Sequence, residues 1–402
     1  MHAIWSILDV IAENDKVTIL ADDLTGAADA CAPLVGAYGS GRVCLSMSTG
    51  MGVQDRKLLS FDGNLRQLSG GRAKRVIDDF AKGLASGNRL GGLVWLKIDS
   101  ATRGHIVRDV TLLLKALPAF RGAVVAPAFP ATGRLFQGGR AVFADGRDPA
   151  ASLREKFEAA GELVFTLSDL AGDAAVIGAR IDAALSGPAR IVLVEVAEQA
   201  DLERLAPALL ARRGDVLGVG SAGLIEAIAG GAGVTPRLMK SNLTCLFGTQ
   251  SRVSRSQIET LEKSRGAIRV SRDPVCWRES ANSELSMVVA RAVQVKASRI
   301  FDICGTTEQD PPESPSFSMA RVVAPFMSRL GTVLISGGDT ARAILDHLGS
   351  KEFDVVGVFE HGIPACTAAN LPDPFFLKSG GFGDSDTLVR LADLIGTSEK
   401  VT

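Results

Sequence analysis

Short apolar runs recur along the chain and alternate with segments whose apolar residues repeat at helical spacing. In the first half, the runs predict strands at 17–21, 42–47, 58–61, 93–98, 122–126, 163–166, 190–196 and 215–219. The intervening periodicity predicts helices that include 71–85, 106–117, 173–185 and 198–212. Alternation of strands and helices favours parallel sheets with helices on both faces.

A second series of the same kind follows residues 230–237, a glycine-rich segment without periodicity that we interpret as a linker. This series predicts strands at 243–247, 267–270, 299–304, 332–336, 354–358 and 375–378, and helices at 254–264, 283–297, 318–329, 340–348 and 386–395, with a proline-rich loop at 307–317. We therefore predict an α/β fold with two domains, 1–232 and 233–402. Each would be a largely parallel sheet flanked by helices.

Composition narrows the class of protein. The 402 residues are 46% hydrophobic and 22% charged, which is typical of a globular chain with a large core. The net charge is −1, so no overall field attracts nucleic acid or an anionic membrane. Six cysteines without a C-x-x-C pair indicate reduced thiols, and the N-terminal segment lacks the basic start of a signal peptide. We expect a cytoplasmic protein that does not span a membrane.

The first polar motif, residues 22–26, follows the first predicted strand directly. Asp22 and Asp23 lie between the strand and a helix that opens near Thr25. Ligands of open α/β sheets bind outside the carboxyl ends of the strands, where carboxylates can hold hydroxyls or accept a proton. The alternative is helix capping, for which one aspartate would suffice.

Two further motifs end strands of the same half. The segment 97–104 places Lys97, Asp99 and Arg103 after a strand, and the Pro/Gly segment 126–140 carries Arg134. Lysine and arginine together suit a carboxylate or a phosphate. An ion-pair cluster and a plain turn are the alternatives.

Glycine-rich loops follow strands of the second half, at 247–252, 335–341 and 378–383. Backbone N–H groups at such a loop and at the helix behind it form an anion site, although Asp339 could instead be a helix cap. The chain contains no Walker-A lysine motif. Three such loops in one domain indicate a nucleotide site, with candidate residues Thr249, Ser251, Gly337, Gly338, Asp339, Thr340, Gly380 and Gly381.

Residues 218–223 match the dinucleotide fingerprint G-x-G-x-x-G. The next predicted strand ends in Gly248-Thr249-Gln250 rather than in the acidic residue that binds a ribose. A tight strand–helix turn is therefore the preferred interpretation, and an NAD-dependent dehydrogenase of an acid sugar is the alternative.

Taken together, the motifs at 22–27, 97–104, 126–139, 220–224, 336–340 and 378–383 resemble those of the four-carbon acid sugar kinase family. The resemblance covers nearly the whole chain. It implies an ATP-dependent kinase of threonate, erythronate or an oxo-tetronate, in which the N-terminal domain holds the acid sugar and the C-terminal domain holds ATP with Mg²⁺. It also implies an active site in the interdomain cleft. A homodimer is also expected.

On this basis we expect Asp22, Asp23 and Asp99 to hold hydroxyls, and Arg103, with Lys97 or Arg134, to meet the carboxylate. Asp23 is the candidate base, and Asp339 could be the base or reach the metal. Several residues depart from the family pattern: Ala101, Leu135, Phe136 and Arg140–Phe143 on the substrate side, and Phe247 in the first nucleotide loop. A non-catalytic homologue that binds nucleotide or acid sugar is thus a further alternative.

Overall fold

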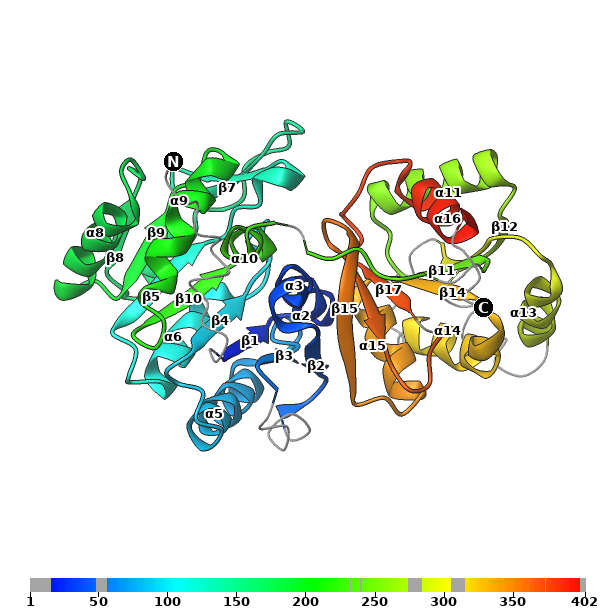
Figure 1. Ribbon diagram of the computed structural model, residues 1–402, viewed down its shortest axis with the longest axis horizontal. Coiled ribbons are helices and arrows are strands. Elements are labelled where there is room, and N and C mark those ends of the chain that lie inside the picture. The colour runs from blue at the N-terminus through cyan, green and yellow to red at the C-terminus, as the bar shows by residue number, and fades with distance from the viewer. Residues whose placement is uncertain are drawn as a thin grey trace. The chain divides into compact units, whose positions relative to one another are not determined.

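The computed structural model describes residues 16–47, 56–231, 233–238, 241–273, 284–304, 315–372 and 374–397. The chain divides into two compact units, residues 1–233 and 234–402. Figure 1 shows that helices flank a sheet in each unit. Most of the proline-rich loop predicted at 307–317 lies outside the described residues, and its last three residues begin a helix.

The sheet of the first unit has the strand order β2-β3-β1-β4-β10-β5-β9-β8, and its pairs are parallel. Except for the edge strand β8, the strands are mostly apolar and almost wholly buried, as expected for a sheet covered on both faces. Their bounds are β1 (Val17–Ala21), β2 (Gly41–Cys44), β3 (Leu58–Asp62), β4 (Leu93–Lys97), β5 (Gly122–Ala126), β8 (Val164–Leu167), β9 (Ile191–Val194) and β10 (Val216–Gly220).

Helices connect these strands. They are α2 (Leu24–Cys31), α3 (Val35–Tyr38), α5 (Gly70–Ser86), α6 (Ile106–Ala116), α7 (Leu153–Ala159), α8 (Ala174–Ser186), α9 (Gln199–Leu210) and α10 (Ala222–Ala229), with 3₁₀ turns η1 (Ala32–Leu34) and η2 (Pro130–Thr132). In α5 the apolar side chains Ala73, Ile77, Phe80 and Leu84 are buried, at the three- and four-residue spacing of one helix face.

The second unit has the order β12-β13-β11-β14-β17-β16-β15. The first five strands are parallel, and the last two are antiparallel additions. The strands are β11 (Leu243–Phe247), β12 (Ile268–Arg272), β13 (Arg299–Ile303), β14 (Thr332–Ser336), β15 (Glu352–Glu360), β16 (Ile363–Thr367) and β17 (Phe375–Lys378). The helices are α11 (Arg252–Arg265), α13 (Glu284–Gln294), α14 (Pro315–Val323), the 3₁₀ helix η4 (Ala324–Arg329), α15 (Gly338–His347) and α16 (Thr387–Thr397).

The predicted α/β class and the largely parallel sheets are confirmed. The sequence reading missed two antiparallel features. Strand β16 forms a hairpin with β15, and β6 (Arg134–Gln137) pairs with β7 (Arg140–Phe143). The turn between β6 and β7 is Gly138-Gly139, and both residues have positive φ (58° and 72°), as a two-residue hairpin turn requires. The predicted helix over 318–329 is α14 followed by η4, where Pro325 lies at the start of the 3₁₀ segment.

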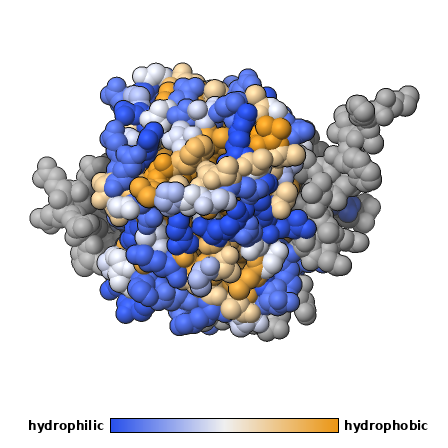
Figure 2. Space-filling model, turned by 90° about the vertical axis from the view of Figure 1, so that its left-hand side faces the viewer, coloured by the Kyte–Doolittle hydropathy of each residue, from blue (hydrophilic) through white to orange (hydrophobic). Residues whose placement is uncertain are grey.

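Strand β8 is the outer edge of the first sheet. Leu163 and Phe165 beside and within it are 57% and 41% exposed. Figure 2 looks onto this side of the molecule, where apolar patches lie between hydrophilic ones. The edge therefore offers apolar side chains next to backbone groups that pair with no further strand of the described sheet.

Candidate functional site

The carboxyl ends of β3, β1 and β4 lie side by side in the first unit. Ala21, the last residue of β1, is in register with Asp62 of β3 and Lys97 of β4. After β1, the chain forms β2 and β3 on one side of β1 in the strand order, and then crosses to β4 on the other side of β1. The residues that follow these strands therefore share the edge at which open α/β sheets bind ligands.

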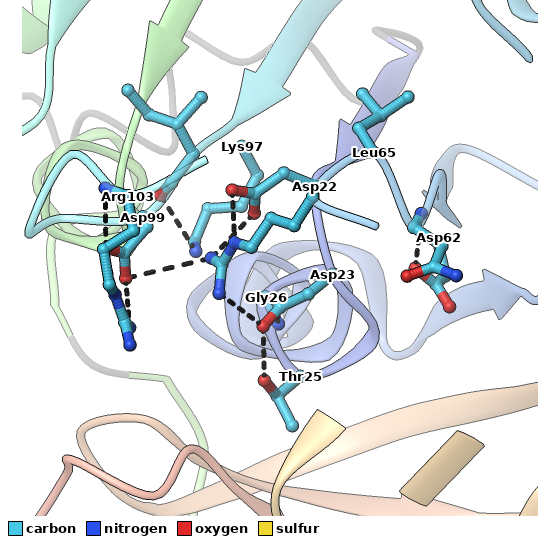
Figure 3. Close-up of polar contacts among 12 residues, drawn as sticks. Asp22, Asp23, Thr25, Gly26, Asp62, Leu65, Lys97, Asp99 and Arg103 are labelled. Carbon is cyan, nitrogen blue, oxygen red and sulfur yellow. Dashed lines mark hydrogen bonds and ion pairs between the residues drawn. The ribbon is translucent and has the colours of Figure 1, made fainter. Parts of the chain in front are cut away.

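The two adjacent aspartates have different roles at this edge. Asp23 is the N-cap of α2, because its Oδ1 accepts from the Gly26 N–H at 2.7 Å. Its Oδ2 accepts from the Thr25 hydroxyl at 3.2 Å. The capping interpretation is thus correct for Asp23, whereas Asp22 is buried and does not cap the helix (Figure 3).

Arg66, which the sequence reading missed, joins three of the predicted carboxylates. Its Nε and Nη2 donate to the two oxygens of Asp22 at 2.7 and 2.9 Å, and its Nη1 donates to Asp23 Oδ2 at 2.9 Å. Nη2 also lies 3.8 Å from Asp99 Oδ1. A planar guanidinium fits such bidentate contact. The sequence feature that could have identified Arg66 is its position, four residues beyond the end of β3 at the same sheet edge.

The loop after β4 is held by an ion pair of its own. Arg103 donates to both oxygens of Asp99 at 2.8 Å, while 64% of the arginine side chain remains exposed. Thr102 has a φ of +56°, which is unusual for a β-branched residue. Its buried hydroxyl has no partner within the described chain. Backbone strain of this kind concentrates at functional sites.

Lys97 and Arg134 are buried beneath this edge. Lys97 Nζ donates to the Ile98 carbonyl at 3.2 Å, and a Cβ on Gly26 would lie 3.0 Å from that ammonium. Arg134, at the start of β6, donates to the Ser100 hydroxyl at 2.6 Å. The structure thus brings all six predicted substrate residues of the first unit to one sheet edge, together with Arg66.

The carboxylates differ in proton affinity. Burial, with a smaller effect from Asp23, raises the pKa of Asp22 to about 6 against the opposing charge of Arg66. Burial alone would also raise the pKa of Asp99, but hydrogen bonds from Arg103 and the charge of Arg66 hold it well below its usual range. The three carboxylates in turn raise the pKa of Arg66 despite its burial. Asp99 is therefore a permanent anion, whereas Asp22 can gain a proton.

Chemically, this edge presents carboxylate oxygens and cationic donors close together. Asp22, Asp23 and Asp99 are all directed towards the Arg66 guanidinium, whereas Asp62 lies apart from them in Figure 3. Carboxylates accept hydrogen bonds from hydroxyls, and the exposed guanidinium of Arg103 suits a carboxylate. The arrangement favours a small ligand that carries both groups.

The second unit has a different edge, where β11, β14 and β17 are neighbours. A Cβ on Gly380 would lie 2.3 Å from Thr249 Oγ1, and a Cβ on Gly248 would lie 1.9 Å from Thr340 Oγ1. The loops after the three strands are thus in close contact, and only glycine fits at these two positions. All the predicted nucleotide residues are on these loops or on the first turn of α15.

Two helices start at this edge without a side-chain cap. Gly337, with a φ of +107°, is the N-cap of α15, and Ser251 is the N-cap of α11. Asp339, considered above as a cap, is instead an exposed residue in the first turn of α15. Free N–H groups at two helix starts form a favourable environment for an anion.

The glycines of the dinucleotide-like motif have a packing role. A Cβ on Gly218 would lie 2.4 Å from the Trp95 ring, and one on Gly220 would lie 2.7 Å from the Ala126 carbonyl. A Cβ on Gly223 would lie 2.8 Å from the Ala128 carbonyl. Close approach between neighbouring elements therefore accounts for all three glycines without a dinucleotide.

Within the described ranges, no group of three or more His, Cys, Asp or Glu side chains is placed to hold a metal ion. Among those same residues, no helix is both long and apolar enough to cross a membrane. Five of the six cysteines are described, and none of these five is in a disulfide.

Family models match both units. A sugar-binding N-terminal domain matches residues 17–156, and a nucleotide-binding C-terminal domain matches residues 244–388. The first match covers the carboxylate edge, and the second covers nearly all of the glycine edge.

Several curated relatives match almost end to end. A D-threonate kinase of Bordetella bronchiseptica is 26% identical over 94% of this chain and 97% of its own length. A D-threonate kinase of Cupriavidus necator is 28% identical over 92% and 95%, and a D-erythronate kinase of Heliobacterium modesticaldum is 23% identical over 95% and 97%.

Solved structures share the fold at low identity. A Salmonella typhimurium protein superposes with a TM-score of 0.73 at 19% identity, covering 94% of this chain and 98% of its own. A Haemophilus influenzae protein gives 0.67 at 18% identity, covering 94% and 100%. With both domain models matched in order and kinases related along nearly the full length, the chain belongs to the four-carbon acid sugar kinase family.

Proposed function

We propose that this protein transfers the terminal phosphoryl group of ATP to a hydroxyl of a four-carbon acid sugar such as threonate, erythronate or an oxo-tetronate. The observation that supports this most is the pairing of two edges in one chain. One edge is rich in carboxylates and guanidinium groups, and the other is rich in glycines and uncapped helix starts. Relatives named as kinases of these acids support the same substrate class.

The acid sugar would bind at the first edge. Arg103 is the best partner for its carboxylate, because its side chain is exposed and its guanidinium is held in place by Asp99. Arg134 and Lys97, both buried beside the loop after β4, add positive charge. Asp22 and Asp23 would accept hydrogen bonds from the hydroxyls, with Arg66 fixing the distance between the two carboxylates.

The reacting hydroxyl must lose its proton as its oxygen bonds to phosphorus and the bond to ADP breaks. We propose Asp23 as the acceptor of this proton, since 22% of its side chain is exposed, compared with 4% for Asp22 and 6% for Asp99. Asp99 is too weak a base because its pKa is depressed. The hydroxyl would compete with Arg66 and Thr25 for Asp23 Oδ2.

The nucleotide would bind at the second edge. Small side chains at this edge leave the backbone accessible to a phosphate chain. They belong to Gly337, Gly338 and Thr340 at the start of α15, to Thr249 and Ser251 at the start of α11, and to Gly380 and Gly381 after β17. Mg²⁺ bound with the nucleotide would neutralise phosphate charge. Asp339, an exposed carboxylate in the first turn of α15, would meet the metal or assist proton removal.

The first test is an ADP-release screen across four- and five-carbon aldonic and oxo-aldonic acids. Turnover with at least one four-carbon acid is expected. ADP release with none of them would contradict the proposal. Stabilisation by ATP and an acid sugar in a thermal-shift assay, without ADP release, would instead identify a non-catalytic homologue.

The roles of the two aspartates are tested separately by Asp23→Asn and Asp339→Asn. Asp23→Asn retains the shape and accepts the Gly26 hydrogen bond, so a loss of kcat of at least 100-fold is expected from removal of the base. Full turnover in this variant would exclude Asp23 as the base. Asp339→Asn should mainly raise the Mg²⁺ concentration required for half-maximal rate.

The predicted homodimer remains a prediction. Sedimentation velocity at micromolar concentration measures it directly. The edge of β8 is the surface to mutate first, and Phe165→Glu should shift the population towards monomer if that edge mediates association.

A further inference from the structure

Lys378 is a buried cation that the proposed mechanism does not use. It is the last residue of β17 and is 0% exposed. Its Nζ lies 3.1 Å from the Ser379 carbonyl oxygen, 3.4 Å from the Gly380 carbonyl oxygen and 3.3 Å from Ser254 Oγ. The Ser254 hydroxyl also donates to the Gly380 carbonyl, at 2.9 Å. Two side chains from different elements thus hold one two-residue loop.

Placing an ammonium there is costly. Burial lowers the pKa of Lys378 to about 7, and in the described chain its Nζ contacts only carbonyl and hydroxyl oxygens. A buried charge without a carboxylate partner destabilises a fold compared with an apolar side chain of similar volume. A role in stability is therefore a poor explanation for this lysine.

The geometry of the peptide bond gives a better explanation for a lysine at position 378. In a planar trans peptide, the carbonyl and the following N–H point in opposite directions. Since the carbonyls of Ser379 and Gly380 are directed inward at Lys378, the N–H groups of Gly380 and Gly381 are directed away from it. Neither N–H donates to an acceptor in the described part of the chain. Successive free amides of this kind form an anion-binding concavity.

We propose that Lys378 is a positioning residue that holds the Gly380 and Gly381 amides in the orientation that binds a nucleotide phosphate. The inference rests on the proposed nucleotide site and adds a residue beneath it. Lys378 acts through the two carbonyls, because the loop lies between its ammonium and the outside. In its protonated form, Lys378 also polarises both peptides and so strengthens their N–H groups as donors.

The test is Lys378→Met, which removes the charge and nearly retains the volume. The Ser379 carbonyl keeps the Phe382 N–H at 3.2 Å, and the Gly380 carbonyl keeps Ser254, so the fold should survive. We expect the KM for ATP to rise at least tenfold, with the KM for the acid sugar within twofold and an unchanged or higher Tm. An unchanged KM for ATP would overturn the proposal.

Arg299→Met is the matched control. Arg299 is also buried, and its guanidinium donates to the carbonyls of Ala292 and Val293 at 2.7 and 3.0 Å. It is the first residue of β13, so it lies at the opposite end of the strands from the glycine loops. This variant should lose stability and leave the KM for ATP within twofold. An equal rise of that KM in both variants would show that any buried cation has this effect, and would refute the specific role.

Ser254→Ala provides a milder second variant, which also serves if Lys378→Met does not fold. Losing one of the two donors to the Gly380 carbonyl should raise the KM for ATP about threefold. In Ser254→Ala, an unchanged KM for ATP would also count against the proposal. Wild-type protein that neither binds nor turns over ATP would refute the proposed function itself, which is a separate outcome.

Discussion

The carboxyl edges of the sheets in the two units present different kinds of polar group. At the carboxyl edge of the first unit, the polar groups are charged side chains: three carboxylates lie around Arg66, and Arg103 lies outside them. At the edge of the second unit they are mainly backbone groups, with glycines at close-approach positions and one buried lysine behind them. A small polyhydroxy acid needs acceptors in many directions, whereas a phosphate chain is held by amides that any residue carries.

This contrast predicts that the first edge is far more sensitive to loss of one side chain. Arg66→Ala should have the largest effect of all, because it leaves Asp22 buried and unpaired beside Asp23 and Asp99. We expect the free energy of unfolding to fall by about 3–5 kcal/mol, and turnover to fall by at least a thousandfold. Urea denaturation and the ADP-release assay measure the two effects.

Arg121→Ala is its control. Arg121 pairs with Asp182 and Asp215 just before β5, at the opposite end of the strands from Arg66, and is 32% exposed. Its loss should cost at most about 1 kcal/mol and leave turnover unchanged. A similar loss of turnover in both variants would show that the Arg66 cluster has no specific role in turnover.

A second prediction separates two carboxylates within the first edge. The folded-state pKa of Asp22 is raised, so folding is penalised once this group is charged. The penalty grows as pH rises from about 4 to about 6. Asp22→Asn should therefore stabilise the protein at pH 8 but not at pH 4.

Asp99 has the opposite sign. Its depressed pKa means that the charged form stabilises the fold at neutral pH, and that this stability is lost as pH falls below the usual range of an aspartate. Asp99→Asn should destabilise the protein at pH 8. Unfolding curves of the two variants at several pH values test both predictions. If both substitutions changed the free energy of unfolding at pH 8 in the same direction, the opposite pKa shifts of Asp22 and Asp99 would be refuted.

The smallest expected effect is in the second unit. Gly380→Ala places a Cβ 2.3 Å from Thr249 Oγ1, so one loop must move. The affinity for ATP should fall about tenfold, which corresponds to about 1.4 kcal/mol, while the KM for the acid sugar stays the same. Gly396→Ala in α16 has open space around it and should leave ATP binding unchanged. Calorimetric titration with ATP compares the two.

The features that could be predicted from the sequence are those formed by residues close together in the chain. Buried parallel strands and the polar residues directly after them were predicted, because both follow from consecutive residues. Arg66 was missed because its partners Asp22 and Asp99 are 44 and 33 positions away and it belongs to no motif. The β15–β16 hairpin was missed because β16 has only five residues and contains Pro364, and a proline within a short run argues against a strand. Contacts that tertiary packing alone creates leave no local pattern.

Trp95 has a consequence for reading related sequences. Its ring occupies the space that side chains at 218 and 220 would need, since a Cβ at either position would come within 2.9 Å of it. Trp95 thus accounts for Gly218 and contributes at Gly220, whereas Gly223 is required by the Ala128 carbonyl. In alignments of homologues, position 95 should covary with position 218. Chains with a smaller residue at 95 should be able to replace Gly218, and so lose the apparent motif without any change of fold.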